Sequence, residues 1–553
     1  MRVRPPSIIA HLNELMDRRG WLDGDDLREL ARRLGEPLHR IEGVASFYPH
    51  YRRTPPPAHT IQACRDLSCA LAAGPEALAR LRAGAAEHQA RTGESVEVHE
   101  VSCLGRCDRA PAALVHHQHP VQGPQTALRA LSEPPEPPPA PATNYRLDPY
   151  PSQDQRYGAL RRLAAAADPD RAAEALIAEL REAGLRGMGG AGFPTATKWG
   201  FVRGAGPEGR GEKFVICNAD ESEPGTFKDR ELLRALPHLV WEGILLAALA
   251  IRAQRGIVYI RHEYEPERRQ LALELERAAP LAQALGIELE IFVSPGGYIM
   301  GEETALLEAL EDRRGEPRNK PPFPGTAGLF GRPTLINNVE TLAIAAAIAA
   351  RGAAWWKDQG VRGCHGLKFV GISGDVAAPG VFEVPMGTTL GELIDLAGGV
   401  AGGKPLLALL PGGASSAFLP AERADTPLDF EHLRRAGSTL GSGAVIVVAE
   451  GRDLLALGIN LTRFFRSESC GKCVPCRVGS EKAVQLLDEL HGGQSPDPRA
   501  SLDLLHDLDA TMAQTSICGL GQVALTPALS LFRNFPGLLA AIPARRPSLR
   551  DRA

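Results

Sequence analysis

The spacing of apolar residues divides the chain into segments of helical and of strand periodicity. Over residues 8–48, apolar side chains recur every three or four positions from Ile8 and Leu12 onward, as on one face of a helix. Asp23 precedes a second run of this kind and is a typical helix N-cap. We therefore expect a small helical bundle at residues 1–55.

Two shorter apolar runs follow, with the length of strands. Residues 60–63 and 96–101 are strand-like, and residues 75–84 between them have helical spacing. This order predicts a separate α/β unit at residues 56–131. Residues 132–151 are rich in proline, which favours extended polyproline II structure, and predict a linker.

The central part of the chain alternates strands and helices. Residues 257–260 and 287–293 are strand-like, and residues 265–279 between them are helical. A strand–helix–strand order predicts a parallel sheet with ligands at the carboxyl ends of its strands. We place this unit at residues 152–350. Its longest apolar run, 239–251, is too short to span a bilayer and predicts a buried helix.

Two more units complete a multidomain α/β protein. Residues 366–450 begin with a strand-like run and contain a capping-box pair, Thr389 and Glu392, which together suggest a β-grasp domain. Residues 451–545 have helical periodicity throughout. We expect no catalytic group in the β-grasp unit.

Composition narrows the class of protein. The 553 residues carry 62 Lys and Arg against 66 Asp and Glu, a formal net charge of −4. This balance favours neither nucleic acid nor an anionic membrane surface as a partner. The start of the chain is followed by no apolar secretion core, and no segment predicts a membrane span, so we expect a cytoplasmic protein.

The glycine-rich stretch at residues 187–199, with the sequence GMGGAGFPTATKW, is the centre of our interpretation. Glycines let a ligand approach the backbone, and Lys198 adds a positive charge suited to phosphate. The spacing matches G-x-G-x-x-G, but the dinucleotide fingerprint follows a strand and opens a helix. Here the loop follows a helical run, 171–183, and precedes a strand-like run, 213–217. On the loop alone, a structural turn and a nucleotide or flavin site both stay open.

Three more polar motifs lie in the same unit. Residues 217–225 and 295–304 follow predicted strands, and residues 333–341 begin a third helical run. Each motif alone is as compatible with capping or turn chemistry as with ligand binding. Four such loops in one α/β unit favour a single shared pocket.

Eight of the ten cysteines have the spacing of metal ligands. Cys64 and Cys69 follow one predicted strand, and Cys103 and Cys107 follow the next. Two pairs at strand ends can converge on one site, and four thiolates bind either zinc or an iron–sulfur cluster. Their spacing leaves both metals open.

The C-terminal cysteines indicate a cluster more specifically. Cys470, Cys473 and Cys476 form a C-x₂-C-x₂-C triplet, which suits one face of a 4Fe–4S cubane. The fourth ligand must come from further along the chain, and Cys518 is the only cysteine downstream. A cluster passes single electrons and a nicotinamide exchanges two as hydride, so a chain that joins them needs a flavin.

Together these motifs resemble the NADH-binding flavoprotein (diaphorase) subunits of respiratory complex I, NAD-reducing hydrogenases and NAD-dependent formate dehydrogenases. The resemblance covers residues 150–541, and residues 1–131 resemble the thioredoxin-like 2Fe–2S subunit of the same systems. It implies a helical bundle with a thioredoxin-like 2Fe–2S domain, a Rossmann-like FMN/NAD domain, a β-grasp domain of the soluble-ligand-binding type and a helical 4Fe–4S domain. The implied cofactors are FMN, NAD, a 2Fe–2S cluster and a 4Fe–4S cluster.

The resemblance also implies roles for individual residues. The residues implied to hold FMN are Gly187, Gly189, Lys198, Asn218, Asp220, Glu221, Gly301, Asn337, Asn338 and Thr341. Gly190 and Glu302 complete the predicted cofactor-binding set, and Tyr298 is expected beside the flavin. Aromatics expected around the NAD adenine are Phe193, Phe201 and Phe323. Residues expected to line the dinucleotide site are Glu223, Glu303 and Lys320, of which Glu223 and Glu303 are the candidate catalytic residues. The implied metal ligands are Cys64, Cys69, Cys103, Cys107, Cys470, Cys473, Cys476 and Cys518. Met188 and Met300 depart from the usual residues without removing a ligand.

Fusion of the 2Fe–2S module to the flavoprotein argues against complex I, and residues 311–324 are similar to the beta subunit of soluble formate dehydrogenases. This resemblance implies an NAD-dependent oxidoreductase subunit that receives electrons from formate oxidation on a partner. The expected partner carries a molybdenum or tungsten pterin site and further clusters, and a separate small 2Fe–2S subunit is a further candidate. An NAD-reducing hydrogenase arm is the alternative, followed by a complex I-type flavoprotein. An electron-bifurcating enzyme and a cluster-bearing scaffold with an inactive flavin pocket also stay open.

Overall fold

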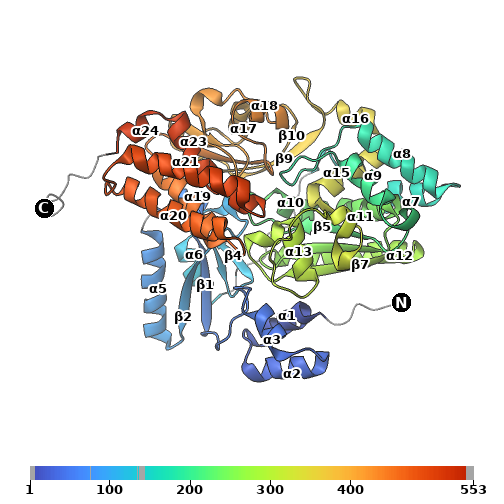
Figure 1. The fold of residues 1–553 in the computed structure, drawn as a ribbon, viewed down its shortest axis with the longest axis horizontal. Helices are drawn as coiled ribbons and strands as arrows, with labels where there is room; N and C mark the ends of the chain where they lie inside the picture. Colours follow the sequence, from blue (N-terminus) through green and yellow to red (C-terminus); the bar gives the residue numbers. More distant parts are fainter. Residues whose placement is uncertain (1–6, 75, 134, 136–143, 543–553) are drawn as a thin grey trace, which may run out of the picture.

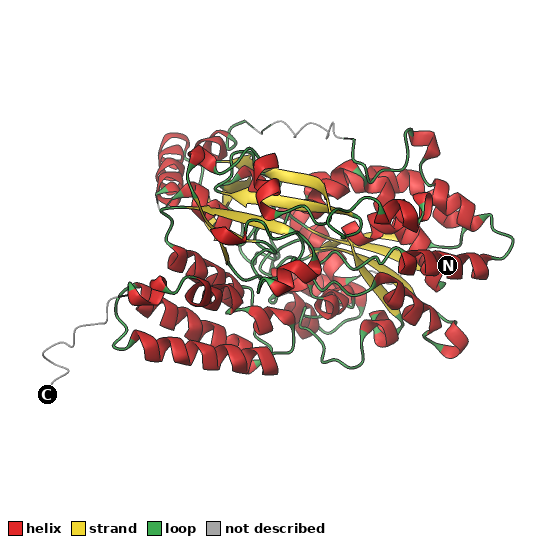
Figure 2. Cartoon of the chain, turned by 90° about the horizontal axis from the view of Figure 1, so that it is seen from above, coloured by secondary structure: helices red, strands yellow, loops and turns green. Residues whose placement is uncertain are grey.

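A computed structural model describes residues 7–74, 76–133, 135 and 144–542. Within them, three β-sheets lie in the interior and helices surround them (Figures 1 and 2). The multidomain α/β class expected from the sequence is confirmed.

The N-terminal bundle consists of three short helices, α1 (Ile8–Arg19), α2 (Gly24–Leu34) and α3 (Leu38–Ala45). Asp23 caps α2, and Asp26 completes a capping box, as the sequence suggested for Asp23. The bundle packs on the central unit rather than standing alone (Figure 1). Asn13 Nδ2 donates to the carbonyl of Val293 at 3.1 Å, and the Tyr48 hydroxyl donates to the carbonyl of Arg313 at 2.6 Å.

The next unit is a four-stranded sheet of order β2-β1-β3-β4, with β1 and β2 parallel. Its strands are β1 (His59–Cys64), β2 (Val96–Val101), β3 (Ala112–Val115) and β4 (His119–Gln122), and its helices are α4 (Leu67–Ala73), α5 (Ala77–Thr92) and α6 (Pro124–Arg129). Both predicted strands are confirmed. The predicted helix at 75–84 runs further, to Thr92, where Gly93 ends it in a left-handed conformation.

The predicted linker lies partly outside the described residues. Its described end is packed, because Leu147 is fully buried and the amides of Arg146 and Leu147 donate to the Glu383 carboxylate at 2.7 and 2.8 Å. This segment therefore straps the central unit to the β-grasp unit.

The central sheet is all parallel, in the order β7-β6-β5-β8. Its strands are β5 (Phe214–Ala219), β6 (Arg255–Arg261), β7 (Glu288–Ser294) and β8 (Thr334–Asn338). The helices around it include α7 (Gly158–Ala164), α8 (Pro169–Glu182), α9 (Thr195–Gly204), α10 (Lys228–Ala235), α11 (Pro237–Ile251), α12 (Glu265–Ala284), α13 (Glu303–Leu310), α14 (Pro324–Ala327), α15 (Val339–Arg351) and α16 (Ala353–Lys357).

One element prediction for this unit is wrong. Residues 333–341 were expected to begin a helical run, but Thr334–Asn338 form strand β8, and helix α15 begins at Val339. The apolar run is too short for its periodicity to distinguish strand from helix. Parallel pairing with β5 makes this segment a strand. Its neighbouring residues Leu335 and Ile336 point to opposite faces of the sheet and are both buried, so the sequence shows no alternation of polar and apolar residues.

No single helix among the described residues is long and apolar enough to cross a membrane. By length and composition α10 and α11 would pass together, but they are bent by 93°. Almost every side chain of α11 is buried inside the protein, as expected for the apolar run 239–251.

The β-grasp unit forms a five-stranded mixed sheet of order β10-β9-β13-β11-β12. Its strands are β9 (Leu367–Gly374), β10 (Gly380–Pro385), β11 (Leu406–Leu410), β12 (Leu419–Pro420) and β13 (Ala444–Ala449), with helices α17 (Leu390–Leu396) and α18 (Phe430–Arg435). Thr389 and Glu392 form the predicted capping box of α17.

The C-terminal unit is helical, as predicted, and its helices lie together at one end of the molecule (red in Figure 1). They are α19 (Leu454–Ser467), α20 (Val474–His491), α21 (Pro498–Thr515), α22 (Gly519–Val523), α23 (Thr526–Asn534) and α24 (Gly537–Ala540).

Candidate functional site

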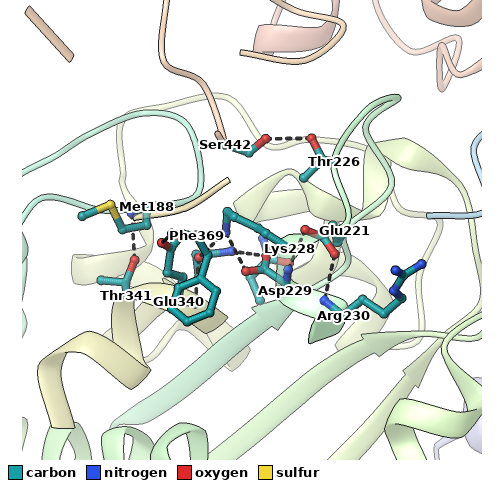
Figure 3. Close-up of polar contacts among 12 residues, drawn as sticks. Met188, Glu221, Thr226, Lys228, Asp229, Arg230, Glu340, Thr341, Phe369 and Ser442 are labelled. Carbon is teal, nitrogen blue, oxygen red and sulfur yellow. Dashed lines mark hydrogen bonds and ion pairs between the residues drawn. The ribbon is translucent and has the colours of Figure 1, made fainter. Parts of the chain in front are cut away.

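The four polar motifs of the central unit meet at the carboxyl ends of its parallel strands. The glycine-rich loop runs between α8 and α9, and the Met188 amide donates to Thr341 Oγ1 at 2.8 Å (Figure 3). Asn218, near the end of β5, donates from Nδ2 to the carbonyl of Gly301 at 2.8 Å. Each motif thus touches another, and this arrangement is the one that a shared pocket requires.

Two glycines of the loop are required by close approach. A Cβ on Gly189 would lie 2.9 Å from the Cβ of Asn338, and one on Gly192 would lie 2.8 Å from the Phe430 ring. Gly192 also has a positive φ of 62°, which disfavours other residues. The loop follows a helix and precedes the helix α9, so it differs from a dinucleotide turn that follows a strand.

Charged side chains gather beside this loop. Lys198 Nζ donates to the carbonyl of Ile336 at 2.8 Å and lies 3.5 Å from the Glu303 carboxylate. Lys320 Nζ bonds to Glu302 at 2.7 Å and lies 3.4 Å from Glu303. Glu303 is therefore shared by two lysines and stays about 29% exposed. Two lysines and two carboxylates balance in charge, and they offer a ligand both donors for phosphate and acceptors for hydroxyl groups.

Beside Met188 and Thr341 lies a buried ionic network that no sequence motif predicted (Figure 3). Lys228 Nζ lies 2.6 Å from Asp229 and 2.9 Å from Glu340, and Lys368 Nζ bonds to Glu340 at 2.5 Å. Lys228, Glu340 and Lys368 are all fully buried. Burial of Lys368 lowers its pKa to about 8. The network ties α10 and α15 to the β-grasp strand β9 and so fixes the floor of the site. Little in the sequence marks it: Glu340 and Lys368 stand among apolar residues, but Lys228 stands in a charged stretch.

Several predicted ligands are engaged by the protein itself. The Glu221 carboxylate accepts the amides of Asp229 and Arg230 at 2.8 and 3.0 Å and the Tyr264 hydroxyl at 2.8 Å. Burial raises the pKa of Glu221 to about 7. These bonds hold the start of α10, so the structure gives Glu221 a positioning role, and its contact with a cofactor stays a prediction.

Other predicted ligands likewise have protein partners. Asn337 accepts from Trp199 Nε1 at 2.9 Å, Asn338 donates to Asp229 at 2.6 Å, and Glu302 caps α13. Burial raises the pKa of Asp220 to about 6, and Ser294 donates to that carboxylate at 2.9 Å.

Glu223 lies against the β-grasp unit. Its Oε1 accepts the amide of Ser415 at 2.8 Å, and burial raises its pKa. Gly413 has a positive φ of 82°, which disfavours other residues, and a Cβ there would lie 3.1 Å from this carboxylate. The β-grasp unit thereby supports one of the two candidate catalytic residues.

Three predicted aromatics are unusually exposed. Phe193, Phe201 and Phe323 have relative exposures of 53%, 56% and 57%. The Phe201 ring also lies 2.9 Å from the position that a Cβ on Gly325 would take, close to Phe323 in the chain. Exposed rings beside charged groups suit a ligand with a planar base.

The N-terminal cysteines converge on one site. Cys103 and Cys107 have their sulfurs 3.6 Å apart, and the Cys64 thiol contacts those of Cys69 and Cys103. All four thiols are free, and backbone amides of Gly105 and Ala112 point at sulfurs, at 3.4 and 3.3 Å. Four convergent thiols with amide donors fit an iron–sulfur cluster.

This cysteine site is docked onto the central unit through buried ions. Arg106 forms a bidentate pair with Glu267 at 2.8 and 2.9 Å, and both side chains are nearly inaccessible. Arg261 donates to the carbonyl of Cys103 at 2.8 Å and also to that of Glu221. The loop that holds the thiols and the loop after β5 therefore share one arginine.

The C-terminal cysteines surround the start of α20. Cys473 is the N-cap of α20, Cys476 lies in its first turn, and Cys518 precedes α22. Cys470 and Cys473 lie near Cys476, and Cys518 lies near Cys470. A Cβ on Gly521 would lie 2.9 Å from that of Cys476, so the close approach of α22 requires glycine. These four thiols fit a 4Fe–4S cluster.

Glu468, two residues before this triplet, connects the three units. Its Oε1 accepts the Ser102 hydroxyl, next to Cys103, and its Oε2 accepts the amide of Tyr298 at 2.8 Å. Glu468 follows α19 as its C-cap, and no local pattern marks its contacts with residues so far away in the chain.

Comparison with protein families assigns each unit. Residues 3–131 match the thioredoxin-like [2Fe-2S] ferredoxin model, and residues 180–347 match the Nuo51 FMN-binding domain. Residues 369–416 match the SLBB domain, and residues 457–541 match the NADH-ubiquinone oxidoreductase-F iron-sulfur binding region. The predicted FMN, 2Fe–2S and 4Fe–4S cofactors are thereby confirmed, and the zinc alternative at the N-terminal cysteines is not supported.

Individual relatives agree with these matches. The chain is 41% identical to the F subunit of the NADH-quinone oxidoreductase of Streptomyces coelicolor over 401 residues, 71% of this chain and 87% of the relative. It is 42% identical to the protein of the same name in Escherichia coli over 361 residues, 63% of this chain and 79% of the relative. Among solved structures, an NAD⁺-reducing [NiFe]-hydrogenase chain aligns with a TM-score of 0.84 at 35% identity, covering 98% of this chain and 94% of that chain.

Proposed function

Because this chain belongs to the family of NADH-quinone oxidoreductase F subunits, we propose that it is the NAD-reactive arm of a multi-subunit oxidoreductase, which moves electrons between a partner subunit and NAD(H) through its two clusters and FMN. The family match makes it an NAD-dependent oxidoreductase subunit. The proposal keeps the cytoplasmic location expected from the sequence.

The observation that carries this proposal is the contact of both cysteine sites with the strand-end loops of the central unit. Arg261 joins the Cys103 loop to the loop after β5, and Glu468 joins the C-terminal triplet to the Tyr298 loop. Electron transfer within one chain needs cofactors close together, and these two contacts hold both cluster sites against the same set of loops.

The residues of the site have distinct proposed roles. FMN, when bound, supplies the conversion between a two-electron hydride and single electrons. The glycine-rich loop and Lys198 would hold its phosphate end, and Asn218 and Asp220 would bond to its ring or its ribityl chain. Glu303 and Lys320 would position the dinucleotide, and the exposed aromatics would stack on its adenine. No side chain has to act as acid or base for hydride transfer.

We propose formate as the primary electron donor, oxidised on a partner with a molybdenum or tungsten pterin site. The basis is the sequence of residues 311–324. In the structure this stretch carries contacts to the N-terminal bundle, since the Ile9 amide donates to Asp312 at 3.0 Å and Tyr48 donates to Arg313. The stretch therefore also reflects the fused architecture, which the hydrogenase arm shares.

Hydrogen is the second candidate donor. A specific observation favours it: the hydrogenase chain aligns over 98% of this chain, including the fused N-terminal module. A nickel-bearing partner would leave every residue role in this chain unchanged.

Metal analysis of the native complex, purified through this chain, tests the choice of donor. Molybdenum or tungsten together with formate-dependent NAD⁺ reduction supports the first candidate, and nickel with hydrogen-dependent reduction supports the second. Flavin release on denaturation and NADH-driven reduction of an artificial acceptor test the enzyme itself. A preparation that lacks both would instead identify a cluster-bearing scaffold.

A further inference from the structure

A second group of metal-ligand side chains lies in the β-grasp unit, apart from all eight cluster cysteines. The Cys364 sulfur, the Asp429 carboxylate and a His432 ring nitrogen lie within 4.8 Å of one another. Cys364 donates to Asp429 Oδ2 at 2.9 Å, and His432 Nδ1 bonds to the same oxygen. Two protons are thus directed at one carboxylate oxygen, where a single metal ion could replace both.

The Asp429 carboxylate is held in place through its other oxygen, Oδ1, so Oδ2 faces Cys364 and His432. Asp429 Oδ1 caps α18 by accepting the amides of Glu431 and His432 at 2.5 and 2.9 Å. The Asp429 side chain is only 11% exposed. Arg362, two residues before Cys364, is paired with Glu392 at 2.5 Å.

The thiol is held in a tight turn before β9. The Cys364 amide donates to the carbonyl of Val361 at 3.0 Å, and a Cβ on Gly387 would lie 3.2 Å from the Cys364 Cβ. Cys364 is partly exposed and His432 is 38% exposed on its side chain, so the site opens to solvent on one side. Ions and chelators can therefore reach it.

We propose that Cys364, Asp429 and His432 bind one zinc ion, with water in the fourth position. A thiolate, an imidazole and a carboxylate together match the ligands that zinc takes in tetrahedral sites, and the thiolate disfavours magnesium and calcium. Zinc binding releases the thiol proton to solvent. The proton on His432 Nδ1 exchanges through solvent to Nε2, so that the neutral ring offers Nδ1 to the metal, and no redox step is involved.

The site would fasten α18 to the turn before β9, next to the glycine-rich loop. The residues after Asp429 reach that loop directly, since the Arg186 guanidinium stacks on the Phe430 ring at 4.1 Å and lies 3.3 Å from Glu431. Arg186 also donates to the carbonyl of Gly192 at 2.7 Å. The ion would thus brace the β-grasp residues on which the loop rests.

The test uses the full chain with FMN and both clusters loaded, supplied with zinc and then freed of unbound metal. We expect one zinc per chain by elemental analysis. Zinc-edge X-ray absorption should show one sulfur neighbour at about 2.3 Å and nitrogen or oxygen neighbours at about 2.0–2.1 Å. Zinc should also slow alkylation of Cys364 by iodoacetamide, read by mass spectrometry, without any measurement of turnover.

Three variants make the test specific. Cys364→Ser should remove the sulfur neighbour, and His432→Ala should weaken binding at least about tenfold, both with iron content unchanged. His365→Ala is the matched control, because His365 neighbours Cys364 but contacts the Lys357 carbonyl instead, and it should bind zinc normally.

Other outcomes overturn the proposal. Failure of the iron-loaded chain to retain zinc would do so directly. A shell of three or four sulfurs that persists in His432→Ala would mean zinc in a cluster site. A sulfur-free shell that persists in Cys364→Ser would point to the other described group of metal-ligand side chains, His59, His88 and Glu94.

Discussion

The two cysteine sites differ in what holds their ligands in place. The N-terminal thiols sit on loops after strands, and buried ion pairs such as Arg106–Glu267 press these loops onto the central unit. The C-terminal thiols lie just before or at the starts of α20 and α22. Buried apolar side chains of the helical unit pack around them, and Glu468 accepts the Tyr298 amide of the central unit. Ion pairs in that unit, such as Arg463–Asp488, lie at the surface. The side of α20 that carries Val474 and Val478 is open to solvent, since these residues are 59% and 56% exposed.

The comparison shows that similar ligand sets can be stabilised by different forces. Breaking a buried pair leaves an uncompensated charge and costs far more than breaking a surface pair. The N-terminal site should therefore depend on its buried ion pair with a neighbouring unit, and the C-terminal site should be little affected by loss of a surface ion pair.

The largest effect should come from removing one ligand at each site. Cys103→Ser should abolish the 2Fe–2S signal and leave the 4Fe–4S signal, and Cys476→Ser should do the reverse, because each thiol belongs to one cluster only. Iron content and EPR spectra of the purified chain measure this. Loss of both signals from either single variant would contradict two independent sites.

Next in size is the docking pair. Glu267→Gln leaves Arg106 buried without its partner and should lower the free energy of unfolding by about 3–5 kcal/mol. The matched change at the surface pair, Asp488→Asn, should cost less than about 1 kcal/mol. Thermal denaturation of the two variants with cofactors loaded compares them, and equal losses would refute the contrast between the sites.

A third test separates the central unit from both sites. Glu242 is fully buried in α11, its Oε1 accepts from Tyr150 and from the Leu160 amide, and its Oε2 has no hydrogen-bond partner among the described residues. Burial raises its pKa from 4.5 to about 7. The folded protein therefore holds this proton more tightly than the unfolded chain, and stability is lost as pH rises from about 4.5 through 7.

Glu242→Gln should remove this loss, which amounts to about 3 kcal/mol over the whole range. The free energy of unfolding should vary less with pH in the variant than in the wild type, while the iron content of both cysteine sites stays the same. An identical pH profile in the two proteins would show that Glu242 does not carry the effect.

The smallest expected effect concerns NADH. Glu303→Gln removes the carboxylate shared by Lys198 and Lys320. It should lower kcat/KM for NADH by roughly fivefold, equivalent to about 1 kcal/mol. Cluster content should not change. Steady-state kinetics with an artificial acceptor provide the measurement, and unaltered kinetics would remove Glu303 from the site.

Local sequence patterns predicted many of the helices and strands and both cysteine sites. The cysteine spacings predicted two metal sites, because ligands within each pair or triplet are close in sequence and must be close in space. Helical periodicity located the N-terminal bundle and the C-terminal helices. The capping residues Asp23 and Thr389 were recognisable because a cap bonds within its own first turn. The four polar motifs of the central unit could be grouped because parallel strands end at one edge.

Long-range contacts were decided only by the tertiary structure. Strand β8 depends on pairing with β5, in which Thr334 lies opposite Phe214, 120 residues earlier in the chain. The five residues of β8 are too few for their periodicity to distinguish a strand from a helix. Glu221 bonds to the amide of Asp229, which no motif marks, and Asn337 bonds to Trp199 of the glycine-rich stretch. Arg106–Glu267, the Lys228 network, Glu468 and the Cys364–Asp429–His432 group join residues that are far apart in the chain. Sequence alone therefore determined which chemical groups the protein has and most of its local structure. Folding decided which of those groups meet, because charge pairing and burial depend on neighbours that only the packed chain supplies.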